Sequence, residues 1–311
     1  NKVRKDLIMK PNTKSLTFEE LYNQIFNDGI ITKQNKDKLY KSAKAINDIK
    51  TIERMSRELD FKNAIKYIEM NSKKVIKELF ISMDTDSIIK AIENGLDVNS
   101  KNDKDSNFLH FAVEQDNRAL IKFLIDKNIN INCQDQDGAT ALLLASQENN
   151  YESIKILIEA NADVNLKSKH GYTPLMASVA KFNSIDAAHL LIKSGAEINV
   201  QDIRGVSPLM LAAQQNFGSM VLLLLENGAN TNLTSIEGYN SLHLPCELGH
   251  ENIVKILLQT DVNINHQDKD GDTPLMIASY HGFKNIIQIL LKKNADLNLQ
   301  NKKGDTALMK A

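Results

Sequence analysis

Hydrophobic residues along this chain fall into pairs of short segments, and the stretch 268–300 shows one complete pair. Its apolar residues are Leu275, Ile277 and Ala278 in the first segment, and Ile286, Ile287, Ile289, Leu290 and Leu291 in the second. The second set has helical spacing, and its apolar face is wider than a solvated helix needs. We therefore expect two helices that cannot bury their apolar surface alone and must stack against similar units.

Residues that start and stop helices frame both segments. Thr273 can cap the first turn, and Pro274 at the first helical position lacks only a donor that would be unsatisfied there anyway. Gly282 separates the two segments, and Asn294 follows the second. Glycine and asparagine tolerate the left-handed backbone found at helix ends. The residues between Asn294 and the next unit predict a turn that projects sideways.

Two independent markers show that this unit is repeated. Opening glycines stand 33, 34, 33, 33 and 33 residues apart, at Gly138, Gly171, Gly205, Gly238, Gly271 and Gly304. A small residue followed by an Asp/Glu-x-Asn-like ending closes the units at Asn99, Asn132, Asn165, Asn199, Asn232, Asn265 and Asn298. Because both markers keep one period, the fold must be read from the repeat.

The Asp-x-x-Gly-x-Thr-Pro-Leu opening and the Gly-Ala-Asp-Val-Asn close of these units resemble the ankyrin repeat. The resemblance covers residues 69 to 311, and the best copies are 135–167, 168–201, 202–234, 235–267 and 268–300. It implies an all-α fold, an ankyrin-repeat solenoid of helix pairs with projecting β-turn fingers. A small helical domain is expected to precede that solenoid.

The chain divides accordingly. Residues 1–14 are polar and aperiodic, which predicts an extended or disordered lead, and the helical spacing in 15–68 predicts a helical N-terminal domain. Residues 69–101 are interpreted as a degenerate first, capping repeat. The other repeats are 102–134, 135–167, 168–201, 202–234, 235–267, 268–300 and a partial repeat at 301–311. The sequence starts without methionine and stops within a repeat helix, so we expect a fragment of a longer protein.

Some units depart from the pattern. Asp105 stands where glycine is usual, and Phe108 takes the proline position, which indicates either a contact with the amino-terminal helices or ordinary repeat drift. The unit 168–201 carries one extra residue, which should lengthen its interhelical loop. Pro245 lies inside a first helix, where its missing N–H should kink or shorten that helix.

The charge distribution does not alter the prediction of an ankyrin-like repeat fold. The net charge of −1 is spread unevenly, because residues 1–80 carry 18 Lys/Arg and 11 Asp/Glu, whereas residues 81–311 carry 20 and 28. The basic residues of the first part are interspersed with acids, which favours a solvated helix face over a nucleic-acid or membrane-surface patch. The longest apolar run, 220–225, is far too short to span a bilayer. We therefore expect no nucleic-acid partner and no membrane insertion.

No catalytic constellation stands out. His243 and His250 could be metal ligands, and Cys246 with His250 could be a nucleophile and its base. All three fall on repeat positions where histidine usually makes structural hydrogen bonds and a small residue packs, and that interpretation is favoured. Cys133 and Cys246 lie three repeats apart, too far for a disulfide, which predicts reduced, intracellular thiols. We expect no cofactor, no metal and no catalytic residue.

The family resemblance implies that a partner binds a concave groove lined by turn tips and by the exposed faces of the first helices. Aromatic, aliphatic and arginine side chains commonly anchor interfaces, although single exposed apolar residues are normal. The positions expected to face a partner are Tyr172, Ile203, Arg204, Gln214, Gln215, Ile236, Glu237, Tyr239, Glu247, Leu248, Tyr280 and His281.

The sequence thus favours a monomeric, cytoplasmic protein–protein interaction module that recruits another protein. It resembles ankyrin-containing effectors that intracellular bacteria deliver into host cells, which would place it in the host cytosol. Viral ankyrin proteins and eukaryotic scaffolds are alternatives. A different class is the substrate-recognition part of an enzyme, whose catalytic domain is the N-terminal helical region or lies outside this fragment. Residues 1–68 contain no histidine and no cysteine, which disfavours a catalyst there.

Overall fold

A computed structural model describes residues 74–82, 84–180 and 183–311 of the chain. The expectations for the lead at 1–14 and the helical domain at 15–68 lie outside these residues. The chain divides into two compact units after Phe108, and each unit is taken by itself. The first unit contributes a helix at 74–82, α6 (Thr85–Glu93) and the turn that leads to Phe108.

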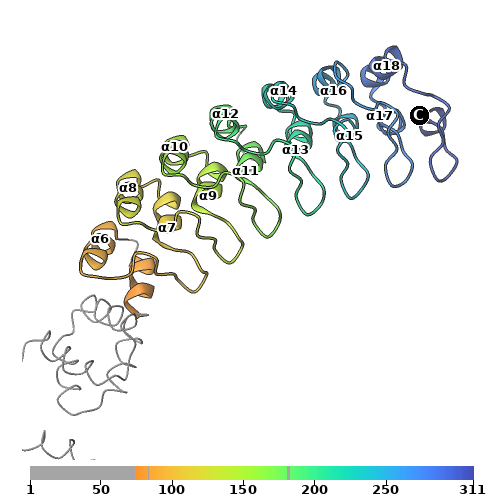
Figure 1. Cartoon of the computed structure of the whole chain (residues 1–311). Helices are drawn as coiled ribbons and strands as arrows, with labels where there is room; N and C mark the ends of the chain where they lie inside the picture. The colour runs from red at the N-terminus through yellow and green to blue at the C-terminus, as the bar shows by residue number, and fades with distance from the viewer. Residues whose placement is uncertain (1–73, 83, 181–182) are drawn as a thin grey trace, which may run out of the picture. The chain divides into compact units, whose positions relative to one another are not determined.

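The second unit, Leu109–Ala311, consists of helix pairs, and its first helix, α7, begins one residue earlier, at Phe108. The first helices of the pairs are α7 (Phe108–Glu114), α9 (Ala141–Gln147), α11 (Pro174–Ala180), α13 (Pro208–Gln214), α15 (His243–Leu248), α17 (Pro274–Tyr280) and α19 (Ala307–Lys310). The second helices are α8 (Arg118–Asp126), α10 (Tyr151–Glu159), α12 (Ile185–Lys193), α14 (Gly218–Glu226), α16 (Glu251–Leu257) and α18 (Lys284–Lys292). Figure 1 shows the second helices in one layer, the first helices in the next, and the loops projecting on the side of the first helices.

The core of this unit lies between the two layers of helices. Leu175 and Met176 of α11 and Leu191 of α12 are fully buried, and the same positions are filled in the neighbouring pairs. From α9 to α19 each first helix packs on the next one along the chain, and from α8 to α18 so does each second helix. The described residues are thus helical and turn-forming, without a β-strand, which confirms the all-α solenoid of helix pairs.

Local sequence explains where the helices start. The hydroxyl oxygen of Thr273 accepts a hydrogen bond from the backbone N–H of Met276 at 3.2 Å, as the predicted cap requires. In return, the sulfur of Met276 lies 3.5 Å from the Thr273 backbone nitrogen. The Ser207–Met210 pair repeats this arrangement two repeats earlier in the chain, with Pro208 as the first helical residue.

The irregular units have distinct local geometries. Asp105 adopts a left-handed backbone with φ of 60°. Phe108 is fully buried and stacks on Phe80 with ring centroids 4.6 Å apart, a contact with the preceding repeat. Helix α15 contains Pro245 and is one residue shorter than α13, with 6 residues against 7. Four residues separate α11 from α12, whereas three separate α9 from α10.

The turn tips are joined by backbone hydrogen bonds. Lys169, Ile203, Ile236, Lys269 and Lys302 each donate their N–H to a carbonyl of the preceding tip, at 2.8, 3.1, 2.8, 2.9 and 2.9 Å. Glycine makes this approach possible, because a Cβ on Gly238 would lie 2.8 Å from the backbone nitrogen of Lys269. The tips therefore form one continuous, tightly packed edge.

The closing asparagines form a second ladder between units. The side-chain oxygen of Asn199 accepts from the Asn230 N–H at 2.7 Å, and its side-chain nitrogen donates to the Gly228 carbonyl at 3.1 Å. Asn165 and Asn232 make the same two bonds to the units that follow them. One side chain thus satisfies two backbone groups of the next repeat.

Replacing Asn199 by alanine should therefore lower the free energy of unfolding by about 1–3 kcal/mol, since two backbone groups lose their partner. Urea denaturation followed by circular dichroism measures this. Asn298→Ala is the matched control. The hydrogen bond of Asn298 lies within its own turn, from its backbone N–H to the Asp296 carboxylate, and it does not involve the side chain that the substitution removes. Equal losses in the two variants would show that the inter-repeat bonds contribute nothing.

Candidate partner-binding surface

The predicted tip residues Ile203 and Ile236 are exposed, at 60% and 52%. They lie on neighbouring tips, since the Ile236 N–H donates to the carbonyl of Arg204. Hydrogen bonds within the turn fix the backbone around Ile203. One carboxylate oxygen of Asp202 accepts hydrogen bonds from the N–H groups of Arg204 and Val206 at 2.9 and 2.8 Å. The tip backbone is thereby fixed while the isoleucine side chain is left in solvent.

Arg204 is held by its own turn. Its Nε and a terminal nitrogen donate to the second carboxylate oxygen of Asp202 at 3.2 and 3.1 Å. The hydrogen bond to Asp202 raises the pKa of the Arg204 guanidinium. Asp202 is buried, whereas the Arg204 side chain is 62% exposed. A partner would therefore meet an arginine whose orientation is already set.

The two tyrosines of the tips are half-buried. Tyr172 packs against a cluster formed by Ala139, Leu143 and Ala177. Tyr239 stacks on the ring of His243 at 5.1 Å between centroids, and burial raises the pKa of its phenol. Both residues thus have a packing role, and their truncation would disturb the fold whether or not they contact a partner.

The helix-face residues follow on consecutive first helices. Leu248 at the end of α15 is 46% exposed and Tyr280 at the end of α17 is 69% exposed. Beside them lie the other predicted positions, of which Gln215 and His281 are exposed and Gln214 and Glu247 are half-buried. Because α13, α15 and α17 pack side by side, the structure brings these residues onto one face.

One neighbour of this face was not predicted. Lys310 of α19 lies over the ring of Tyr280, 5.9 Å from its centroid, and its Nζ is 2.8 Å from a carboxylate oxygen of Asp272. The other carboxylate oxygen of Asp272 accepts from the side chain of Asn301 at 2.7 Å. These partners stand 29 to 38 residues apart, so no local signal points to them. Alignment of the repeats by equivalent positions would have predicted that Asp272, Asn301 and Lys310 lie close together.

The candidate chemical residues make contacts within the fold. Nδ1 of His243 lies 2.7 Å from the side-chain oxygen of Asn240, and Nε2 of His250 lies 3.0 Å from the Gln214 carbonyl. Cys246 is fully buried, and burial raises the pKa of its thiol, which opposes a nucleophilic role. Cys133 and Cys246 are free thiols. Within the described ranges, no group of three or more His, Cys, Asp or Glu side chains is placed to hold a metal ion.

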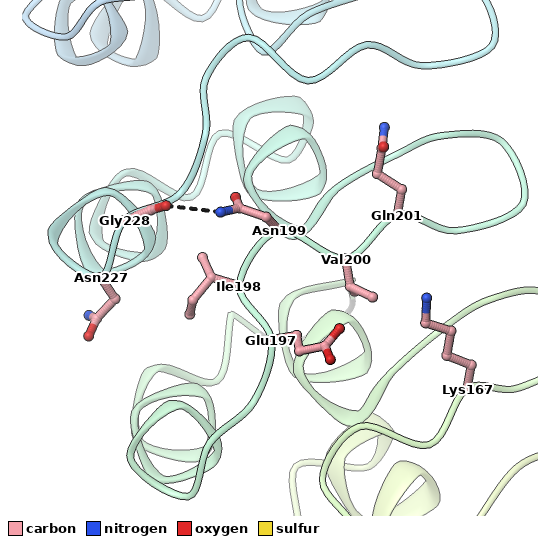
Figure 2. Close-up of a pocket in the computed structure, with 8 residues that line it drawn as sticks. All are labelled: Lys167, Glu197, Ile198, Asn199, Val200, Gln201, Asn227 and Gly228. Carbon is pink, nitrogen blue, oxygen red and sulfur yellow. Dashed lines mark hydrogen bonds between the residues drawn. The ribbon is translucent and has the colours of Figure 1, made fainter.

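A separate, shallow depression of about 680 Å³ lies between the units that close at Asn199 and Asn232 (Figure 2). Its walls include Lys167, Glu197 and the Asn199 side chain, whose amide is bonded to Gly228. It is open and contains none of the predicted partner-binding residues. Among the helices that the structure describes, none combines the length and apolar character that a bilayer-spanning segment requires.

Comparison with known proteins agrees with this architecture. A family model that describes three consecutive ankyrin repeats matches the chain at residues 72–168, 109–202, 175–268 and 260–311. Among solved structures, the ankyrin repeat domain of Bcl-3, a member of the IkappaB protein family, is 26% identical with a TM-score of 0.62, covering 67% of this chain and 95% of that chain. No protein with a curated description matches. Because the family matches together span residues 72–311, well over half of the sequence, this chain belongs to the ankyrin repeat family.

Proposed function

We propose that this chain recruits a partner protein through the tips and first-helix faces of its middle repeats. Ankyrin repeats are generally protein–protein interaction modules. The observation that supports a specific surface is the clustering of exposed apolar side chains there: Ile203, Ile236, Leu248 and Tyr280 are 60, 52, 46 and 69% exposed on consecutive repeats. Residues of these types, when desolvated together, supply most of the binding energy of an interface.

The opposite layer offers a contrast. Its large exposed apolar side chains are Tyr151, Leu222 and Leu291, one on each of three second helices. Isolated apolar residues of this kind are normal on a protein surface. The tips and first helices therefore carry the stronger case. We also propose a cytoplasmic location, since the reducing cytoplasm keeps thiols free and Cys133 and Cys246 are free and buried.

A comparison of capture experiments tests this function. The chain, an Ile203→Ser/Ile236→Ser/Tyr280→Ser variant and a Leu222→Ser/Leu291→Ser control are each used to capture proteins from a cytosolic lysate. The three replaced residues are exposed, so circular dichroism and unfolding should change little. A protein bound by the chain and the control, and reduced at least about tenfold for the surface variant, is the expected result.

The control decides the meaning of a loss. A protein retained by the surface variant, or lost equally from the control, would place binding elsewhere on the chain. Tyr172 and Tyr239 are kept in all variants, because both are half-buried and their removal would confuse folding with binding.

A further inference from the structure

Tyr172 and Tyr239 occupy the last position of two turn tips that are built alike. In both tips the tyrosine follows a glycine, and its backbone N–H donates to the hydroxyl of the serine that opens the tip, at 3.2 Å in each case. Each of the two tips is also joined to the tip after it by the inter-tip backbone hydrogen bond. Residues at equivalent positions therefore surround the two tyrosine rings, and their side chains can be compared directly.

The residue that the next tip brings toward the tyrosine differs between the two places. After Tyr172, the third residue of the next tip is Arg204. The hydrogen bond with Asp202, and to a smaller extent the neighbouring Tyr172, raise the pKa of the Arg204 guanidinium. After Tyr239, the same position of the next tip holds Asp270. A guanidinium of the chain itself thus stands beside the first tyrosine, and a carboxylate takes its place beside the second.

Two further equivalent positions also become acidic around the second tyrosine. The equivalent residues are Ala180, Arg204 and Val206 around Tyr172, and Glu247, Asp270 and Asp272 around Tyr239. Over these three positions the formal charge changes from +1 at the first tyrosine to −3 at the second. The second tyrosine therefore has the same backbone frame as the first but lacks the cation that the first one holds.

The packing of the repeat places these carboxylates close to the Tyr239 ring. Tyr239 stacks on His243 of α15, and Glu247 lies one turn further along the same face of that helix. The tip of Asp270 is joined to the tip of Tyr239 by an inter-tip hydrogen bond of 2.9 Å. Burial raises the pKa of the Tyr239 phenol, and the neighbouring carboxylates, of which Glu247 acts most strongly, raise it further.

The same face already binds one cation of the chain. The Nζ atom of Lys310 lies 2.8 Å from a carboxylate oxygen of Asp272 and over the ring of Tyr280, 5.9 Å from its centroid. Tyr280 of α17 stands at the repeat position that Glu247 occupies on α15. An aromatic ring next to a carboxylate therefore accommodates a positively charged group on this face.

Exposed apolar side chains lie beside these carboxylates. Leu248 and Tyr280 are 46% and 69% exposed at the ends of α15 and α17, which pack against each other. We call the whole area the Tyr239 surface, and it consists of Tyr239, Glu247, Leu248, Asp270, Asp272 and Tyr280. It therefore combines aromatic and aliphatic contact area with carboxylates.

The sign of the charge does not depend on where the surface is taken to end. Adding the charged neighbours Glu237, Asp268, Lys269 and Lys310 gives five negative and two positive charges, a net −3. The six tips taken together, from 135–139 to 301–305, also carry a net −3, and residues 81–311 carry −8. A positively charged ligand is therefore favoured at every scale.

We propose that the Tyr239 surface binds an arginine side chain of the partner protein, with the guanidinium against the Tyr239 ring and beside the Glu247 and Asp270 carboxylates. This inference rests on the proposed function and specifies the partner's chemistry. Apolar residues next to that arginine cover Leu248 and Tyr280. Arginine fits better than lysine, because its planar guanidinium stacks on aromatic rings and donates several hydrogen bonds in fixed directions. Nucleic acid would bring phosphates to a negatively charged surface, which opposes its binding.

Labelled synthetic peptides test this inference by fluorescence anisotropy. Each peptide carries one variable residue between leucines in a glycine–serine background, and that residue is arginine, lysine, citrulline or glutamate. Citrulline keeps the shape of arginine but has no charge. The arginine peptide should bind about tenfold more tightly than the citrulline and glutamate peptides at low salt, with the lysine peptide in between. This advantage should shrink as the salt concentration rises.

A variant that copies the surroundings of Tyr172 gives the sharper result. Glu247→Ala/Asp270→Arg gives Tyr239 two of the neighbours that Tyr172 has, so it should abolish the preference for arginine over citrulline. The fold should be kept, because the hydrogen bonds of Asp270 within and between tips involve its backbone N–H and carbonyl. Circular dichroism and urea denaturation check this.

Two other variants serve as controls. Glu226→Ala/Glu159→Arg makes the same change of charge at the exposed ends of α14 and α10, and it should leave the preference unaltered. Leu248→Ser/Tyr280→Ser removes apolar contact area, so it should weaken all four peptides about tenfold and keep their order.

Several outcomes would overturn the inference: no binding of any peptide, equal binding of the arginine and citrulline peptides, or an unchanged preference in Glu247→Ala/Asp270→Arg. Tighter binding of a labelled oligonucleotide than of the arginine peptide would also overturn it. If the captured protein is lost from the Ile203/Ile236/Tyr280 variant but kept by Glu247→Ala/Asp270→Arg, the proposed function stands and this inference fails.

Discussion

Gly238→Ala should lower the free energy of unfolding by about 3 kcal/mol. Two costs combine. The backbone of Gly238 has φ of 81°, where a residue with a Cβ costs about 1–2 kcal/mol. The new methyl group would also lie 2.8 Å from the Lys269 nitrogen, so the tips must separate and the Lys269-to-Glu237 hydrogen bond at 2.9 Å is weakened. Losing that bond adds about 1 kcal/mol.

Gly228→Ala is the matched control for this experiment. Gly228 has nearly the same backbone, with φ of 85°, but a Cβ there would meet nothing within 4 Å. It should cost only about 1–2 kcal/mol, the conformational part alone. Urea denaturation of both variants measures the difference. If the two substitutions are equally destabilising, the close approach of the tips contributes nothing to stability.

Acidification should destabilise the chain through His243. Burial, followed by the charge of His266, lowers the pKa of His243 from 6.5 to about 4. The unfolded chain therefore takes up a proton below about pH 6.5, whereas the folded chain keeps the imidazole neutral until about pH 4. Stability contributed by this residue is intact above pH 6.5 and falls as the pH drops toward 4, by about 3 kcal/mol in total.

The surroundings of His243 explain the size of this effect. Its ring is fully buried between Tyr239, which stacks on it, and His266, whose ring meets it edge-on at 5.7 Å. Its Nε2 is buried, and among the described residues it has no hydrogen-bond partner. In the part of the chain that the structure describes, no carboxylate is hydrogen-bonded to the ring, so a proton added to His243 would leave an uncompensated buried charge.

A double substitution separates His243 from the other titrating groups. Asn240→Thr/His243→Met gives this unit the Thr-x-Leu-Met start found at Thr173–Met176, and it removes the buried imidazole. Unfolding free energies measured between pH 7.5 and 4.5 should fall less steeply for the variant. Parallel pH profiles for the variant and the original chain would assign the acid sensitivity to other residues.

Much of the fold was predictable from sequence because its determinants are local and periodic. These determinants are the Thr-Pro caps, the left-handed Gly and Asn residues at helix ends, and the apolar spacing. Each of them acts within a few residues, and each occurs in several repeats, so it could be identified more than once. The shorter α15 around Pro245 and the longer loop before α12 followed from the same rules. The ankyrin family and its stacked helix pairs could therefore be inferred before the structure was known.

The candidate surface was only partly predictable. Its positions came from the repeat register, but the sequence could not separate Ile203 and Ile236, which are exposed, from Tyr172 and Tyr239, which are half-buried. Burial of a tip residue depends on the unit before or after it, about one repeat away in the chain. The partner-binding role of these residues stays a proposal.

Sequence by itself determined the repeat, the helix pairs and the register in which equivalent residues recur, because these depend on short-range backbone preferences and on apolar periodicity. Tertiary structure alone decided which side chains meet across repeats. It placed the Asn199 amide on the next unit, Lys310 over Tyr280, and the exposed Ile203 and Ile236 on neighbouring turn tips. The physical reason is that stacking brings together groups about 33 residues apart, and their separation, burial and charge are fixed only when the units pack.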